Sequence, residues 1–248
     1  MDVKEIVGNS EYSKGYHRKR RILRMLIIIT GLASFMLIIL TYYGHNAGNF
    51  TIRVNESNNR SIAISETLEG LDTNPQSRLS TKAISDASDL TYSNIKVTQA
   101  TQTDGAYKDR LFNYMAYTFY CKNVGQRAGT LVYSMSCFEA SKNMDAAARV
   151  MLIEETWNRD ISSNIYRKLD PVIDLGYGGT EIYWDETNWL DSSIIFEKEI
   201  ENFMVGEYRK FTLFIWLEGH DPDTTDQILG GKVKFDMLLT INPNDVGW

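Results

Sequence analysis

The densest group of candidate ligands lies in the segment 216–231, which reads WLEGHDPDTTDQILGG. Four carboxylates fall close together there: Glu218, Asp221, Asp223 and Asp226. Carboxylate oxygens are the ligands that Ca²⁺ prefers, and His220 adds a nitrogen. The spacing differs from an EF-hand, because Asp226 and Lys232 stand where that loop needs Gly and Glu. The segment suits either a structural turn between strands, which we favour, or a calcium site.

The two cysteines, Cys121 and Cys137, are too few for a disulfide scaffold and lack the clustered spacing of a zinc site. They lie in two β-rich runs, residues 114–122 and 130–138, on the faces that we expect to point inward. A Gly-containing loop joins the runs and predicts a hairpin. In that hairpin the thiols form either a cross-strand disulfide or two buried, apolar side chains.

Catalytic motifs are missing from the sequence. The three histidines are His17, His45 and His220, and no H-E-x-x-H pair could place two of them on one helix face for zinc. No G-x-S-x-G elbow is present, and Gly231-Lys232 lacks the upstream Gly of a phosphate loop. We therefore expect no enzyme, no catalytic residues and no cofactor apart from the candidate calcium ion.

Five aromatic residues invite a carbohydrate-binding interpretation, because aromatic faces stack on sugars: Trp184, Trp189, Trp216, Tyr177 and Tyr183. Packing inside a core or at the end of a sheet is the commoner role of such residues. We favour packing and keep glycan binding as the alternative.

The elements that position these residues are mainly strands. Alternation of apolar and polar residues predicts a strand at 210–218, with Phe211, Leu213, Ile215 and Leu217 inward and Lys210, Thr212 and Glu218 outward. It predicts a second strand at 232–241, with Val233, Phe235, Met237, Leu239 and Ile241 inward. We also expect a strand at 49–54 and a short helix at 144–148 that leads into a strand. Residues 56–104 are rich in Ser, Thr and Asn and predict a flexible stretch, with 90–97 as its best strand. Several strands without long helices predict an all-β sandwich of two sheets.

Composition agrees with a β protein: 14 Tyr, 10 Phe and 5 Trp occur among 248 residues with only 4 Pro. Charge is unevenly divided, because residues 1–24 hold 7 of the 26 Lys and Arg but only 3 of the 32 Asp and Glu. The remainder carries 19 basic and 29 acidic residues. This acidic surplus argues against nucleic acid as a partner.

An apolar run without charge covers residues 25–43 and is long enough, at about 1.5 Å per residue, to cross a hydrocarbon core of about 30 Å. We expect a cytoplasmic basic tail at 1–21, a transmembrane helix or uncleaved signal anchor at 22–43, and an extracellular domain at 44–248. Cleavage would release the domain. It is disfavoured, because His45 would stand at the −3 position if the chain were cut after Ala47.

Several blocks of the sequence resemble the exported Gram-positive proteins related to TasA and camelysin. They are the WLEG-x-DPD…GG-K-x-K-F order at 216–235, an Asn202-Phe-x-x-Gly206 approach, and the stretches 48–52, 117–125 and 148–151. The resemblance implies a jelly-roll-like sandwich outside a bacterial cell and, in some members, a fibre component of the biofilm matrix. Relatives often have cysteine at the position of Thr224. Camelysin has been classed as a metalloprotease, but no zinc motif accompanies the resemblance here.

We therefore expect a non-enzymatic cell-surface β-sandwich, membrane-anchored or exported, that takes part in envelope or biofilm-matrix assembly. Its expected partners are the lipid bilayer, through residues 22–43, and other surface or matrix proteins, including further copies of itself. The alternative is an extracellular ligand-binding module for calcium or glycans on the same fold.

Overall fold

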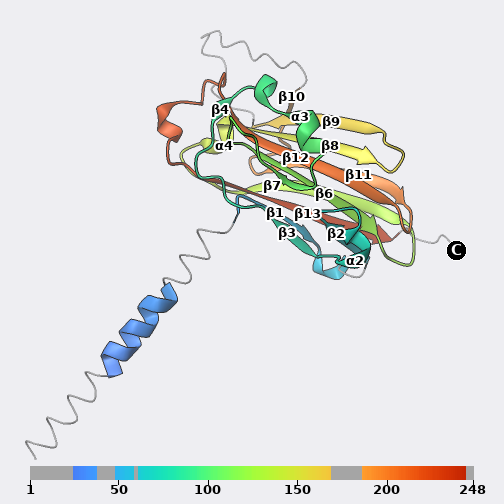
Figure 1. Ribbon diagram of the computed structural model, residues 1–248, viewed down its shortest axis with the longest axis horizontal. Helices are drawn as coiled ribbons and strands as arrows, with labels where there is room; N and C mark the ends of the chain where they lie inside the picture. Colours follow the sequence, from blue (N-terminus) through green and yellow to red (C-terminus); the bar gives the residue numbers. More distant parts are fainter. Residues whose placement is uncertain (1–24, 38–47, 59–60, 169–185, 244–248) are drawn as a thin grey trace, which may run out of the picture. The chain divides into compact units, whose positions relative to one another are not determined.

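The computed structural model describes residues 25–37, 48–58, 61–168 and 186–243, and the chain divides into two compact units, Met1–Asn46 and Ala47–Trp248 (Figure 1). In the first unit, residues 25–37 are helical. Within the described ranges, no helix has both the length and the apolar character needed to cross a bilayer. The predicted tail at 1–21 and both ends of the predicted span lie outside these ranges.

The second unit is built from two β-sheets, which confirms the expected all-β, two-sheet class. The five-stranded sheet has the order β11 (Ile194–Phe203), β7 (Gly129–Ala140), β13 (Val233–Pro243), β1 (Phe50–Val54) and β3 (Arg78–Ser80). The main path of the eight-stranded sheet is β10 (Glu186–Asn188), β9 (Ile161–Arg167), β8 (Ala148–Thr156), β12 (Tyr208–Glu218), β6 (Met115–Asn123) and β2 (Ile62–Ser65). Two short strands complete it, β4 (Asp89–Leu90) beside β12 and β5 (Gly105–Tyr107) beside β6.

Helical elements of the second unit are short and connect the strands. They are η1 (Glu56–Asn58), α2 (Gly70–Thr73), η2 (Tyr92–Asn94), α3 (Val97–Thr101), α4 (Met144–Ala147) and η3 (Asp226–Ile228). The change from α4 directly into β8 confirms the predicted helix-to-strand junction, and β1 confirms the predicted first strand.

The main core lies between the two sheets and contains every residue predicted to point inward from β12 and β13. Aromatic rings join the sheets at its centre. The ring of Phe211 on β12 stacks on Phe119 of β6, with centroids 5.2 Å apart, and Tyr133 of β7 approaches the same ring to 5.2 Å. Alternation thus identified the interior faces because each inner sheet face must be apolar.

A second layer covers the outer face of the eight-stranded sheet. The segment 89–114 packs against it and closes a smaller core made of Leu90, Ile95, Ala100, Tyr114, Ala116, Met151, Ile153, Phe214 and Trp216. Thr212 and Glu218, which were predicted to point to solvent, are therefore buried, while Lys210 is half-buried. That part of the prediction is wrong because β12 is covered on both faces.

The predicted hairpin of 114–122 and 130–138 is also wrong. The runs do form β6 and β7, with Met115, Tyr117, Phe119, Cys121, Leu131, Tyr133, Met135 and Cys137 all in the main core. However, β6 pairs with β12, β2 and β5, whereas β7 pairs with β11 and β13 in the other sheet. The loop between β6 and β7 crosses from one sheet to the other. The sequence could not show this, because two strands have the same inward apolar pattern whether they pair in one sheet or face each other from two sheets.

The stretch 56–104 contains β2, α2, β3, β4, η2 and α3 together with η1, and its predicted strand at 90–97 is wrong. Single apolar residues anchor it at intervals: Leu71, Leu79, Leu90, Ile95 and Ala100 are all buried. Because these anchors follow neither a period of two nor one of 3.6, no pattern in the sequence indicated them.

Truncation of the central ring should test the core. We expect Phe211→Ala to lower the free energy of unfolding by about 3 to 5 kcal/mol, because a fully buried aromatic side chain leaves a cavity. Phe138→Ala is the matched control, since this phenylalanine is mostly exposed, and its effect should stay within about 0.5 kcal/mol. Urea titration followed by tryptophan fluorescence measures both. Equal effects would contradict the assignment of the core.

Candidate functional site

A buried arginine organises the end of the sandwich where β8 begins. Arg149 is 1% exposed, and its Nε donates a hydrogen bond of 3.0 Å to Glu186 Oε1 on β10. Its Nη2 donates to Asp221 Oδ2, at 2.7 Å, in the turn after β12. One guanidinium therefore joins three segments that are far apart in the sequence. Pairing with two carboxylates offsets the desolvation of the buried charge.

Further charged groups extend this ion-pair cluster. Arg167 at the end of β9 approaches Glu186, with Nε 3.7 Å from Oε2, and the next residue, Lys168, pairs with Asp145 of α4. The ammonium of Lys168 also lies 5.7 Å from the ring centroid of Trp189. The cluster is built from alternating charges and holds β8, β9, β10 and α4 together.

The predicted calcium ligands have separate roles in this structure. Asp221 accepts from Arg149 and from the backbone N–H of Asp223, and Glu218 Oε2 accepts from the Trp216 indole N–H at 3.0 Å. Burial raises the pKa of the Glu218 carboxyl, and the Trp216 hydrogen bond lowers it only in part. Asp226 is exposed in η3. Among the described residues, no three His, Cys, Asp or Glu side chains are grouped so that they could hold a metal ion.

The turn itself is fixed by local hydrogen bonds. Thr224 Oγ1 donates to the carbonyl of Glu218 at 2.7 Å, and the N–H of Asp221 donates to the same oxygen at 3.0 Å. Thr224 thus closes the turn through its hydroxyl. These hydrogen bonds are those of a turn between strands, and the calcium site stays a prediction.

Of the two alternatives for Cys121 and Cys137, the structure has the buried thiols: both cysteines are free and buried. Cys121 stands opposite Ile64 and Arg209 in the eight-stranded sheet, whereas Cys137 stands opposite Phe235 in the five-stranded sheet. Cys121 lies near the end of β6, and Cys137 lies near the far end of β7. The thiols therefore pack as small apolar groups in different sheets.

Two of the five candidate sugar-stacking aromatic residues are described by the structure, and both are buried. Trp216 is buried under the outer layer and Trp189 is buried beside the ion-pair cluster, so neither presents a ring face to solvent. Both are packing residues. Tyr177, Tyr183 and Trp184 lie outside the described residues.

One polar cluster was missed from the sequence. Between the sheets, Glu154 of β8 accepts hydrogen bonds from Tyr133 Oη and Lys198 Nζ, each at 2.7 Å. Lys198 Nζ also donates to Asn164 Oδ1 at 2.9 Å. The available signal was Lys198 itself, a lysine between Phe196 and Ile200 on one face of a strand.

A hollow of about 500 Å³ lies beside β2 and the segment 75–77. Its lining residues are mostly apolar: Ile62, Ala63, Leu71, Asp72, Pro75, Gln76, Ser77 and Val124. The carboxylate of Asp72 is paired with Lys122 at 2.5 Å. Among the described residues that line the hollow, no other side chain is charged.

Comparisons with protein-family models, with curated proteins and with solved structures gave no match.

Loss of the buried guanidinium should be costly. We expect Arg149→Ala to lower the free energy of unfolding by about 3 to 5 kcal/mol, because Glu186 and Asp221 would be left buried without their cation. In the control, Arg53→Ala, the arginine is half-exposed and its pair with Asp236 contributes about 1 kcal/mol or less. Chemical denaturation measures both variants. A cost below 1 kcal/mol for Arg149→Ala would contradict the bridging role.

Thiol titration should distinguish free cysteines from a bridge. Burial raises the pKa of both thiols, that of Cys137 to about 11, so the native protein should react slowly near neutral pH. After unfolding in the absence of reductant, we expect two reactive thiols per chain. If no reactive thiol were found after unfolding, the two cysteines would be joined in a disulfide.

Proposed function

We propose that this protein is a non-enzymatic, jelly-roll-like β-sandwich of a bacterial cell surface, anchored or exported through residues 22–43, that acts in envelope or biofilm-matrix assembly. Support comes from the resemblance to the TasA and camelysin proteins and from the two-sheet architecture. The buried charged groups described above are engaged in ion pairs that hold strands together. Interaction then falls to the surface of the sandwich.

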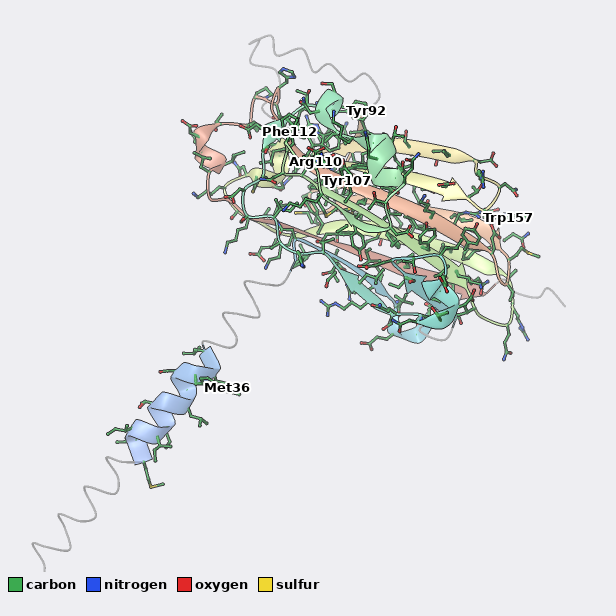
Figure 2. The ribbon with its side chains drawn as sticks, viewed as in Figure 1. Met36, Tyr92, Tyr107, Arg110, Phe112 and Trp157 are labelled. Atoms are coloured by element: carbon green, nitrogen blue, oxygen red, sulfur yellow. The ribbon has the colours of Figure 1, made fainter. Side chains whose placement is uncertain are left out.

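The observation that carries the proposal is a set of exposed apolar residues at one end of the sandwich, here called the loop tips. They come from the β6–β7 loop, the β8–β9 hairpin and the β11–β12 turn: Val124 (43% exposed), Trp157 (58%), Ile161 (69%), Met204 (53%) and Val205 (52%). Large exposed apolar side chains gathered in one region are typical of an interaction site. Figure 2 shows Trp157 at this end of the second unit.

Backbone contacts hold the loop tips together. The N–H of Gly206 donates to the carbonyl of Asn123 at 2.8 Å, and Arg209 stands opposite Thr156, next to Trp157. The buried side chain of Asn123 donates to the carbonyls of Phe203 and Arg127. The three loops are therefore fixed side by side before any partner binds, which lowers the entropic cost of binding.

The chain enters the sandwich at the opposite end. Phe50, the first residue of β1, stands beside Phe235, and β1 runs parallel to β13 toward Pro243, which stands opposite Gly129 near the loop tips. Within the second unit, the loop tips therefore lie at the opposite end of the strands from the start of β1. This position favours contact with another surface component.

Strand edges are less suited to assembly. The long edge strand β11 carries Glu197, Glu199 and Glu201 on its exposed face, points Lys198 inward and contains two register shifts. Charges and bulges of this kind protect an edge against pairing. The other edge strands of the main sheet paths, β3, β10 and β2, have only three or four residues. The structure favours the loop tips over strand addition as the contact surface.

The helical segment supports the proposed anchor. Its apolar side chains are exposed around the described residues 25–37, Met36 among them (Figure 2). Thr30 Oγ1 donates to the carbonyl of Leu26 at 2.9 Å, so its hydroxyl is satisfied within the helix. A helix that is apolar on all sides is typical of a bilayer or a large core.

Cell fractionation tests the location. The full chain with a C-terminal tag, produced in a Gram-positive host, should appear in the membrane or the medium, and protease added to intact cells should remove the tag. A cytoplasmic protein of known location is the control. Recovery of a protected tag in the cytosol would overturn the proposed location.

Substitution of the loop tips tests the contact surface. We expect Trp157→Ser with Met204→Ser and Val205→Ser to weaken self-association or binding to a cell-envelope fraction at least about tenfold, since apolar anchors dominate interfaces. Sedimentation velocity and envelope co-sedimentation of the full chain in detergent measure this. Phe138→Ser, an equally exposed apolar residue on β7 outside the loop tips, should leave binding unchanged. Unaltered binding by the triple variant would contradict the assignment.

A further inference from the structure

The polar cluster between the sheets brings together an amine, an amide and a carboxylate. Lys198 Nζ, on β11 of the five-stranded sheet, lies 2.9 Å from Asn164 Oδ1 on β9 and 2.7 Å from Glu154 Oε1 on β8. Both partners belong to the eight-stranded sheet. The carbon of the Asn164 amide is one C=O bond, about 1.23 Å, from the contacted oxygen. The amine is therefore close to a carbon that it can attack.

The register of the strands explains why the side chains of Lys198, Asn164 and Glu154 meet. Asn164 stands opposite Leu152 on β8, so Glu154, two residues further, shares its face and is its diagonal neighbour. Lys198 stands opposite Tyr133 on β7 and points into the space between the sheets. The spacing is a product of regular pairing rather than of mobile loops.

Aromatic side chains wall the cluster. Tyr133, Tyr166 and Phe196 are nearly fully buried, with the Tyr166 and Phe196 ring centroids 4.9 Å apart and those of Tyr133 and Phe196 6.3 Å apart. The side chain of Lys198 is 29% exposed and that of Glu154 is 13% exposed. Restricted access of water favours aminolysis of the amide over hydrolysis and strengthens the electrostatic contacts.

We propose that Lys198 and Asn164 form an intramolecular isopeptide bond, with Glu154 as the acid–base catalyst. Glu154 takes one proton from the Lys198 ammonium, and the neutral amine attacks the side-chain carbonyl carbon of Asn164. The new C–N bond forms as the bond from that carbon to the amide NH₂ breaks. The leaving group receives a proton from the amine and one through Glu154.

The reaction balances without an external reagent. One ammonium and one primary amide become one secondary amide and one ammonium ion, and Glu154 ends ionised as it began. No oxidation state changes. The inference does not depend on the proposed function, because it requires only that the sandwich folds.

The bond would fasten the edge strand β11 to β9 across the two sheets, where the strands otherwise meet through side chains alone. It would also close a covalent loop between residues 164 and 198. A cross-link of this kind restricts the unfolded chain in the way that a disulfide does. It would do so without thiols, consistent with the free Cys121 and Cys137.

Intact-mass spectrometry of the purified full chain, denatured before measurement, tests the bond. We expect a mass one ammonia, about 17 Da, below the value calculated from the N-terminal residue found by sequencing. A tryptic digest should contain a branched peptide that joins Lys198 to Asn164, with no cleavage after Lys198. A full mass without the branched peptide would overturn the proposal.

Variants assign the roles. Lys198→Arg and Asn164→Ala should have their full calculated masses, and Glu154→Gln should slow formation at least about 100-fold, in line with the usual contribution of acid–base catalysis. Lys210→Arg is the matched control, because Lys210 pairs with Glu155 at 3.3 Å on the neighbouring strands and should leave the ammonia loss intact. Circular dichroism confirms that each variant folds.

Two outcomes separate this bond from other ammonia losses. A succinimide at another asparagine lowers the mass by the same amount, but it would persist in Lys198→Arg. Persistence there would overturn the proposal. If a variant fails to fold, the branched peptide of the natural sequence decides the question by itself.

Discussion

The structure depends on the burial of both faces of the central strands β6, β8 and β12 in the eight-stranded sheet. Its inner face meets the five-stranded sheet, and its outer face is covered by the segment 89–114. β12 lies at the centre of this arrangement and is buried along most of its length. Where a strand is buried on both faces, as β12 is along most of its length, a polar group on either face must find a partner within the protein.

That requirement explains the two polar clusters. Arg149 stands opposite Trp216 on the covered outer face and pairs with Glu186 and Asp221. Lys198 points between the sheets and contacts Glu154 and Asn164. In both places a cation connects its own strand to a strand with which it does not pair, β8 to β10 through Arg149 and β11 to β8 and β9 through Lys198. The contacts that satisfy the buried charge therefore also fix the relative position of these strands. Ion pairs and hydrogen bonds depend on direction, whereas apolar contacts hardly do, so these groups specify how the strands are oriented in the core.

The sequence predicted the strands better than their partners. Alternation located β12 and β13 and their inward residues correctly, because a sheet face that lines a core must be apolar. It gave no information on which sheet a strand joins, so β6 and β7 were wrongly paired, and the choice between a disulfide and two buried thiols stayed open although Cys121 and Cys137 lie in different sheets. The acidic turn was conspicuous in composition, yet Asp221 serves Arg149, which is distant in sequence. The cluster around Lys198 joins three strands, and only a fold could bring those residues together.

The place of β13 in the five-stranded sheet has a consequence for the order of folding. This strand is the last of those described along the chain, yet it lies between β7 and β1 at the middle of the sheet. During synthesis, β1 therefore has no neighbour on its β13 side until residues 233–243 have left the ribosome. Contacts of such long sequence separation form late. The five-stranded sheet therefore becomes continuous only after translation has passed its final strand, because β13 alone joins the β11–β7 pair to the β1–β3 pair.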